Sequence, residues 1–335
     1  MTLPSLHARA IVVDGLVVSR WSREIFEEMR IGGITAANCT LAVWEGFDDG
    51  MVNIADLGGL LDEHSDVIRP VRTVADIRAA KLEGRVGIVL GWQNVSPLGD
   101  DLRRLGLFHE LGLRVVQLAY NTQNSVGSGC YESRDSGLSD FGHEVVGELD
   151  RLGIVIDLSH VGPLTARGAV HAAQRPVAYT HVCPAALKPH PRNKSDEDLR
   201  LVAERGGLVG VTPFPWFLPE PTLDSFLDAV EHTIAVAGEE HVGIGTDFTQ
   251  GHGDAFVEWI MRDKGYARLL TQTPLDELRV VMPEGLRRLS DWPNLTRAME
   301  ARGWRDERIL RVLGENWLRF LGDVWHAPAS AGGSG

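Results

Sequence analysis

Residues 86–94, VGIVLGWQN, form an apolar run that ends in two neutral amides, Gln93 and Asn94. A run without in–out alternation predicts a parallel strand that is buried on both faces. Seven further runs have the same character: AIVVDG (10–15), GITAANCTLA (33–42), RVVQLAYNT (114–122), GIVIDLSH (153–160), PVAYTH (176–181), GGLVGVTP (206–213) and HVGIGTDF (241–248). The eight runs indicate a parallel sheet whose strands end in polar residues.

Segments with a helical pattern lie between most of these runs, for example SREIFEEMRI (22–31) and TLDSFLDAVEHTIAVAG (222–238). Eight strands that alternate with helices over about 250 residues favour one α/β domain, a (β/α)8 TIM barrel. A doubly wound open sheet is the alternative, but no Gly-rich phosphate loop follows any run. We expect residues 1–325 to form a single domain with a C-terminal helical cap, and residues 326–335 to form a flexible tail.

Charge and composition limit the possible partners. The formal net charge of −13 argues against a nucleic-acid surface, which needs clustered lysine and arginine. Three widely spaced cysteines form no CxxC pair, which indicates a reducing cytoplasm. No secretory signal is evident, and no apolar run approaches the roughly 20 residues that span a bilayer. We therefore expect a cytoplasmic protein with a small-molecule substrate, acting on neither nucleic acid nor a membrane.

Polar residues at the strand ends are the candidate site, because chemistry in a barrel lies at the C-terminal ends of its strands. His160 and His181 end two adjacent runs, and Asp247 ends the last run. Either histidine alone could be an ordinary buried residue, but their joint placement favours a zinc site with an open position for water. The other polar candidates at or after strand ends are Glu45, Gln93, Tyr120, Asn121, Gln123, Asp157, His190, Arg192 and Asn193.

The segments GIVIDLSHVG, PVAYTH, HPRNKSDEDLRLVAERGGLVGV, VGIGTDFTQG and GENWLRFL resemble, in order and spacing, the membrane (renal) dipeptidase family of zinc peptidases. The resemblance covers residues 8–325 and implies a barrel of the metallo-dependent hydrolase type. It also implies a two-zinc centre, dipeptide hydrolysis and a homodimer. By this resemblance His160 and His181 match the ligands of the second zinc, and Arg192 matches the residue that binds the substrate carboxylate. Asp247 matches the aspartate near the attacking water and the substrate amine.

The chain departs from the family pattern at four positions. Leu16 and Val18 stand where the family has the histidine and aspartate that bind the first zinc. Gln93 replaces the glutamate that bridges the two zinc ions, and Tyr120 replaces a histidine that contacts the substrate. Two unit charges about 4 Å apart repel by about 4 kcal/mol at an effective dielectric of about 20, and two dications have four times that charge product. A neutral amide cannot offset this repulsion, so we expect no two-metal centre.

Three functions remain open on this reading. The first is a dipeptidase-like metallohydrolase with one zinc ion on His160 and His181, completed by Gln93, Asp247 or water. The second is an enzyme on the same scaffold with altered, metal-independent chemistry on a small amino acid derivative. Here Tyr120 acts as an acid, and Tyr120, Asn121 and Gln123 contact the substrate beside Arg192. The third is a binding protein without catalytic activity. A barrel fold alone does not distinguish them.

Overall fold

A computed structural model describes residues 4–261 and 280–325 of the 335-residue chain. All eight predicted strands are present: β1 (Val13–Val17), β2 (Ala36–Ala42), β4 (Val86–Trp92), β5 (Leu113–Gln117), β6 (Val155–Asp157), β7 (Ala178–Val182), β8 (Leu208–Val211) and β9 (Val242–Ile244). They pair in this order, each parallel to the next. Apart from β3, described below, all the strand residues are buried, which explains the continuous apolar runs.

The sheet closes on itself between β1 and β9. Backbone N–H groups of Val18 and Asp247 donate to the carbonyl oxygens of Phe248 and Leu16, at 2.9 and 3.0 Å. Val17 and Phe248 also form a parallel bridge beyond the end of β9. These contacts complete the predicted (β/α)8 barrel.

A further strand, β3 (Ile68–Val71), was not among the predicted ones. It pairs with Val86–Val89 of β4, ahead of the point where β5 pairs with Leu90–Trp92. Arg69 and Pro70 interrupt its apolar pattern, and β3 is only half-buried, so no continuous apolar run marks this strand.

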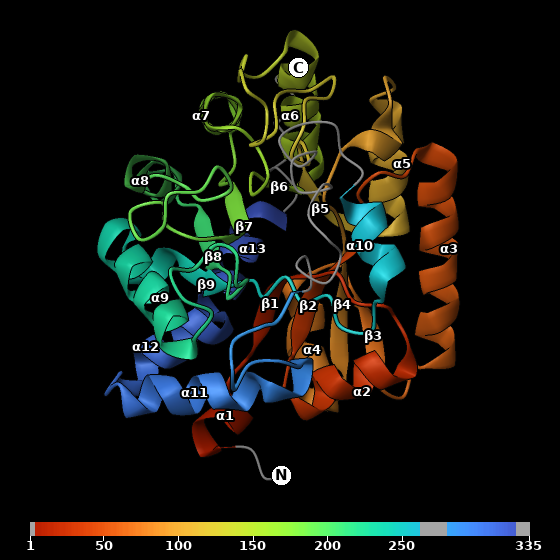
Figure 1. Cartoon of the computed structure of the whole chain (residues 1–335). Helices are drawn as coiled ribbons and strands as arrows, with labels where there is room; N and C mark the ends of the chain where they lie inside the picture. The colour runs from red at the N-terminus through yellow and green to blue at the C-terminus, as the bar shows by residue number, and fades with distance from the viewer. Residues whose placement is uncertain (1–3, 262–279, 326–335) are drawn as a thin grey trace, which may run out of the picture.

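Helices cover the outside of the strands in Figure 1. They are α1 (Ser5–Arg9), α2 (Arg23–Ile31), α3 (Phe47–Glu63), α4 (Val74–Glu83), α5 (Arg103–Leu111), α6 (Asp140–Leu152), α7 (Pro163–Ala172), α8 (Asp196–Glu204), α9 (Leu223–Ala237), α10 (Asp254–Ile260), α11 (Trp292–Ala301), α12 (Asp306–Leu310) and α13 (Asn316–Trp325). Short 3₁₀ turns lie at Ser96–Leu98, Glu239–His241 and Leu289–Asp291, and a π turn at Arg311–Glu315 joins α12 to α13. Side-chain hydroxyls cap the N-termini of α2, α4, α6, α8 and α9, which fixes where these helices begin.

The C-terminal helix α13 packs against the barrel interior, as we expected for a C-terminal helical cap. Its Trp317, Leu318, Phe320, Leu321 and Val324 share a core cluster with inward residues of the strands. The Trp317 indole N–H donates to the carbonyl oxygen of Ile244, at 3.1 Å. The predicted tail, 326–335, lies outside the described residues. Within the described part of the chain, no helix combines the length and apolar character needed to cross a membrane.

Candidate active site

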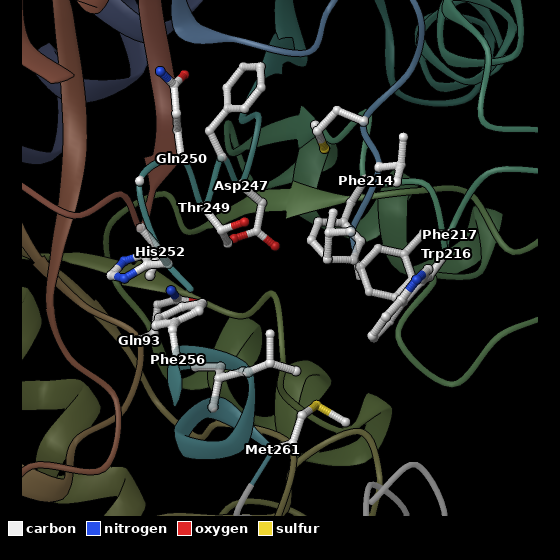
Figure 2. A pocket seen from close by; sticks show the side chains of 18 of the residues that line it. Gln93, Phe214, Trp216, Phe217, Asp247, Thr249, Gln250, His252, Phe256 and Met261 are labelled. Atoms are coloured by element: carbon white, nitrogen blue, oxygen red, sulfur yellow. The ribbon is translucent and has the colours of Figure 1, made fainter. Parts of the chain in front are cut away.

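The C-terminal ends of the strands surround a cavity of about 620 Å3. Gln93 follows β4, Tyr120 and Asn121 follow β5, His160 follows β6 and Asp247 follows β9, and all five line the cavity. Figure 2 shows the Asp247 carboxylate directed toward the middle of the cavity, with Gln93 on one side. The structure thus brings together five of the predicted residues, which come from four different strands.

The two predicted histidines face each other. The Nε2 atoms of His160 and His181 lie 3.0 Å apart. His160 lines the cavity, whereas His181, on β7, is fully buried. Burial lowers the pKa of both imidazoles well below the usual value, and the positive charge of Arg192 acts in the same direction. Both rings are therefore neutral at pH 7, the form in which imidazole binds metals.

Hydrogen bonds on the far side of each ring fix its orientation. The Thr180 hydroxyl donates to Asp157 Oδ2 at 2.7 Å, so it accepts from His181 Nδ1, also at 2.7 Å. His160 Nδ1 lies 2.7 Å from Asn121 Oδ1, an acceptor. With both Nδ1 atoms donating, the two Nε2 lone pairs point at each other, and a proton or a metal ion between them would relieve their repulsion.

Two of the candidate residues hold a backbone conformation that ordinary residues rarely adopt. Asn121 has φ 59° and Asp247 has φ 57°, and they are the only non-glycine residues with positive φ in the described part of the chain. Such strain is concentrated at functional sites, where the surrounding structure maintains it. Burial also raises the pKa of the Asp247 carboxyl to about 7, although the positive charge of Arg192 opposes the shift.

Tyr120 lies directly on His160. The rings of Tyr120 and His160 stack with centroids 4.1 Å apart and planes at 23°. Trp44 packs edge-on against the Tyr120 ring, with centroids 5.2 Å apart. The tyrosine therefore occupies space beside the imidazole pair, at the position where the resemblance implies a histidine.

Neither Arg192 nor Gln123 lines the cavity. The Arg192 side chain is fully buried and donates from Nη1 to Ser159 O and from Nη2 to His181 O, at 2.6 and 2.7 Å. Within the described residues, its Nε has no hydrogen-bond partner. Gln123 is exposed on the loop after β5 and does not line the cavity. Substrate contacts by these two residues stay predictions.

The donor set does not fit a two-zinc centre. Leu16 and Val18 are buried apolar side chains at the end of β1. The Gln93 Nε2 donates to Thr40 Oγ1 at 3.1 Å, so the amide is tied to β2 and contributes no charge. Across residues 4–261 and 280–325, no group of three or more His, Cys, Asp or Glu side chains is placed to hold a metal ion. The two convergent imidazoles fit only part of the ligand set of a single ion.

Sequence reasoning missed one whole side of the cavity. Phe214, Trp216 and Phe217 come from the loop after β8, and Phe256, Met261 and Met282 come from the region after β9. The aromatic cluster in PFPWF (213–217) was a usable signal, because it directly follows a predicted strand. The residues after 250 carried no such signal, since no strand placed them at the site.

The fold and this site define a class, the (β/α)8 barrel proteins that carry an active site at the C-terminal ends of their strands. The family model for membrane dipeptidases, peptidase family M19, matches residues 27–273. The chain belongs to this family of metallopeptidases, which confirms the resemblance seen in the sequence. It is 30% identical over 281 residues to the dipeptidase aclJ of Aspergillus oryzae and 28% identical over 280 residues to the dipeptidase tcpJ of Claviceps purpurea.

These alignments cover 81% and 82% of this chain but only 60% and 59% of the two fungal proteins. The crystal structure of an amidohydrolase from Pseudomonas aeruginosa matches with a TM-score of 0.91 and 49% identity, over 96% of this chain and 98% of that one. A metallopeptidase from Rhodobacter sphaeroides, solved with a phosphinate mimic of the dipeptide L-Ala-D-Ala, matches with a TM-score of 0.78. The match to the Rhodobacter sphaeroides protein covers 94% of this chain and all of the other chain. At 22% identity it shows a shared fold and no more.

Proposed function

We propose that this chain is a dipeptidase-like hydrolase that acts on a dipeptide or a small amino acid derivative, with one metal ion rather than two. The observation that carries the proposal is the pair of neutral imidazoles, whose Nε2 lone pairs converge beside a cavity that also holds Asp247. Membership of the dipeptidase family and the likeness to an amidohydrolase support it.

In this proposal the ion would be zinc, and His160 and His181 would hold it, with Gln93 as a further ligand. A bound zinc ion would polarise the substrate carbonyl or lower the pKa of a water molecule. Asp247 accepts a proton from the attacking water, because a carboxyl with a pKa of about 7 is well matched to that task at neutral pH. Water adds to the amide carbon, the C–N bond breaks, and the amine leaves with the proton.

The test is hydrolysis of a dipeptide panel by protein freed of metal with a chelator and then supplied with zinc or manganese. Turnover that depends on about one equivalent of metal supports the proposal. No turnover across the panel under any metal condition contradicts it.

A second candidate is metal-independent chemistry on the same class of substrate, and the position of Tyr120 favours it. A phenol stacked on His160, with a neutral amide at Gln93 in place of the bridging carboxylate, suits proton transfer rather than metal binding. Activity that persists in chelator-treated protein with no measurable metal would select this candidate. A ligand that raises the melting temperature without being converted would select the third possibility, a binding protein.

The other properties rest on the family resemblance and the cysteines. We propose a homodimer and a substrate with a carboxylate, both of which the resemblance implies. Cys39, Cys130 and Cys183 are all free thiols, which is consistent with our proposal of a cytoplasmic location. Light scattering on the purified protein tests the dimer.

A further inference from the structure

The loop between β8 and α9 presents three aromatic rings to the cavity, and we call Phe214, Trp216 and Phe217 the aromatic wall. Phe214 and Phe217 stack at 5.1 Å between centroids, and Trp216 stands edge-on to Phe214 at 5.5 Å. In Figure 2 these rings lie together on the side of the cavity opposite Gln93 and His252. Phe214 and Phe217 are nearly buried, and Trp216 is half-buried.

The aromatic wall is held rigidly by the neighbouring loop after β7. The Asn193 amide donates to the carbonyl oxygen of Phe217 at 2.9 Å, and Lys188 Nζ donates to that of Leu218 at 2.8 Å. The Arg192 guanidinium lies over the Phe217 ring, 5.5 Å from its centroid. A surface fixed before binding loses little conformational entropy when a ligand settles on it, so its contacts contribute efficiently to affinity.

The apolar lining extends beyond the aromatic wall, because Val257, Ile260, Met261, Val280 and Met282 also line the cavity. Its polar lining includes Gln93, Tyr120, Asn121, His160 and Asp247, and also Thr249, Gln250, His252, Asp254 and Arg287. Figure 2 shows the Asp247 carboxylate between the aromatic rings and Gln93. The cavity therefore has one part suited to an amide group and another suited to a large apolar group.

The volume of the cavity is also consistent with a polar part and a separate apolar part. A cavity of about 620 Å3 is within the range of sites that enclose ligands of roughly drug size, and is much larger than a dipeptide of glycine or alanine needs. A small substrate would leave the apolar part filled with water. A large apolar side chain would displace that water and cover the rings.

We propose that the preferred substrates carry an aromatic or long apolar side chain, which lies against the aromatic wall while the scissile amide lies beside Asp247. The proposal rests on the hydrolase function proposed above and names the substrate class for it. Transfer of a phenyl-sized group from water to an apolar surface corresponds to about a 10- to 100-fold gain in affinity.

The test separates binding from turnover. Reduced-amide isosteres of Gly-Phe, Phe-Gly and Gly-Gly, in which CH2–NH replaces the amide, are titrated by calorimetry against the full chain. We expect at least one benzyl-bearing isostere to bind about 10- to 100-fold more tightly than the Gly-Gly isostere. Hydrolysis of the three parent dipeptides is measured in parallel, and kcat/KM should follow the same order.

Three variants identify the surface responsible. Trp216→Ala should lose most of the benzyl preference, and Trp216→Phe should keep it. Trp325→Ala is the matched control, because Trp325 is also half-buried but donates to the carbonyl oxygen of Arg114 near the start of β5, at the other end of the barrel. A benzyl preference that survives Trp216→Ala as fully as Trp325→Ala would overturn the proposal.

The two proposals fail differently. Equal affinity and equal kcat/KM for the phenylalanine and glycine compounds would overturn the aromatic preference and leave the hydrolase function standing. A clear benzyl preference in binding, with no hydrolysis of any dipeptide, would overturn the hydrolase function and leave the aromatic wall as a ligand surface.

Discussion

The Asp14 carboxylate joins the two ends of the barrel sheet: its Oδ1 accepts from the Thr246 backbone N–H at 2.8 Å, and its Oδ2 accepts from the Thr246 hydroxyl at 2.5 Å. Asp14 belongs to β1, and Thr246 follows β9. Asp157 repeats the arrangement between β6 and β7, where it accepts from the Thr180 backbone N–H at 3.0 Å. Buried carboxylates thus supply hydrogen bonds where the strand ladders are short.

Asp14 should make stability depend on pH. Burial raises its pKa to about 7, whereas the unfolded chain titrates near 4. Between these values the unfolded state has lost a proton that the folded state keeps, so the free energy of unfolding falls as pH rises. At about 1.4 kcal/mol per pKa unit, the fall is on the order of 4 kcal/mol from pH 4 to 7 and levels off above pH 7.

The Asp14→Asn variant isolates this contribution, because an amide oxygen can still accept from Thr246 while the titration is gone. Urea unfolding between pH 4.5 and 7.5 measures both proteins. We expect the stability of the wild type relative to the variant to decrease steadily as pH rises. Parallel curves over this range would show that Asp14 ionises normally in the folded state.

Replacing either histidine of the facing pair should abolish hydrolysis. His160→Ala and His181→Ala are each expected to lower kcat/KM at least about 100-fold, the usual size of a lost catalytic group. His143→Ala is the control, because His143 is an exposed residue of α6 that does not line the cavity. A His160→Ala protein with near-normal turnover would remove the imidazole pair from the mechanism.

The missing ligands should limit the number of zinc ions that the protein binds. Plasma mass spectrometry of the wild type is expected to find at most about one equivalent of zinc. Gln93→Glu alone should not raise this number, because Leu16 and Val18 still offer no donor atoms. The combined variant Leu16→His, Val18→Asp and Gln93→Glu should bind about two equivalents. Two tightly held equivalents in the wild type would contradict our account of the donor set.

Trp317 should make Gly15 and Gly243 intolerant of any side chain. A Cβ on Gly243 would lie 2.5 Å from the Trp317 Nε1, and a Cβ on Gly15 would lie even closer to the Trp317 Cζ2. Gly243→Ala is expected to lower the free energy of unfolding by about 1–3 kcal/mol, the usual cost of overpacking. Gly58→Ala on α3 meets no atom within 4 Å and should instead gain about 0.5–1 kcal/mol. Thermal unfolding of both variants provides the comparison.

The barrel was predictable because its strands are buried on both faces, so each appears as an uninterrupted apolar run. Where burial is partial the signal weakened: Arg69 and Pro70 interrupt β3, and three glycines, Gly50, Gly58 and Gly59, obscure the helical pattern of α3. The helix α13 was expected as a cap, and the structure adds that its Trp317 fills the barrel interior.

The candidate site was predictable only as far as strand ends define it. His160, Asp247, Gln93, Tyr120 and Asn121 meet because parallel strands end on one side of a barrel. The partners of Arg192 could not be predicted, since its sequence position reveals a cation but not that two backbone carbonyls take its donors. The aromatic wall was missed although PFPWF follows a predicted strand, because loop residues reach the cavity by tertiary packing, which leaves no period in the sequence.

The position of Trp317 has a consequence for synthesis of the protein. Its indole fills space between β1, β8 and β9, so the first strand of the chain and one of its last helices share one core. A nascent chain that has not yet released α13 from the ribosome cannot pack this interior, and its barrel must remain open. Final closure of the barrel core therefore waits for the synthesis of α13 and is not reached on completion of the eighth barrel strand.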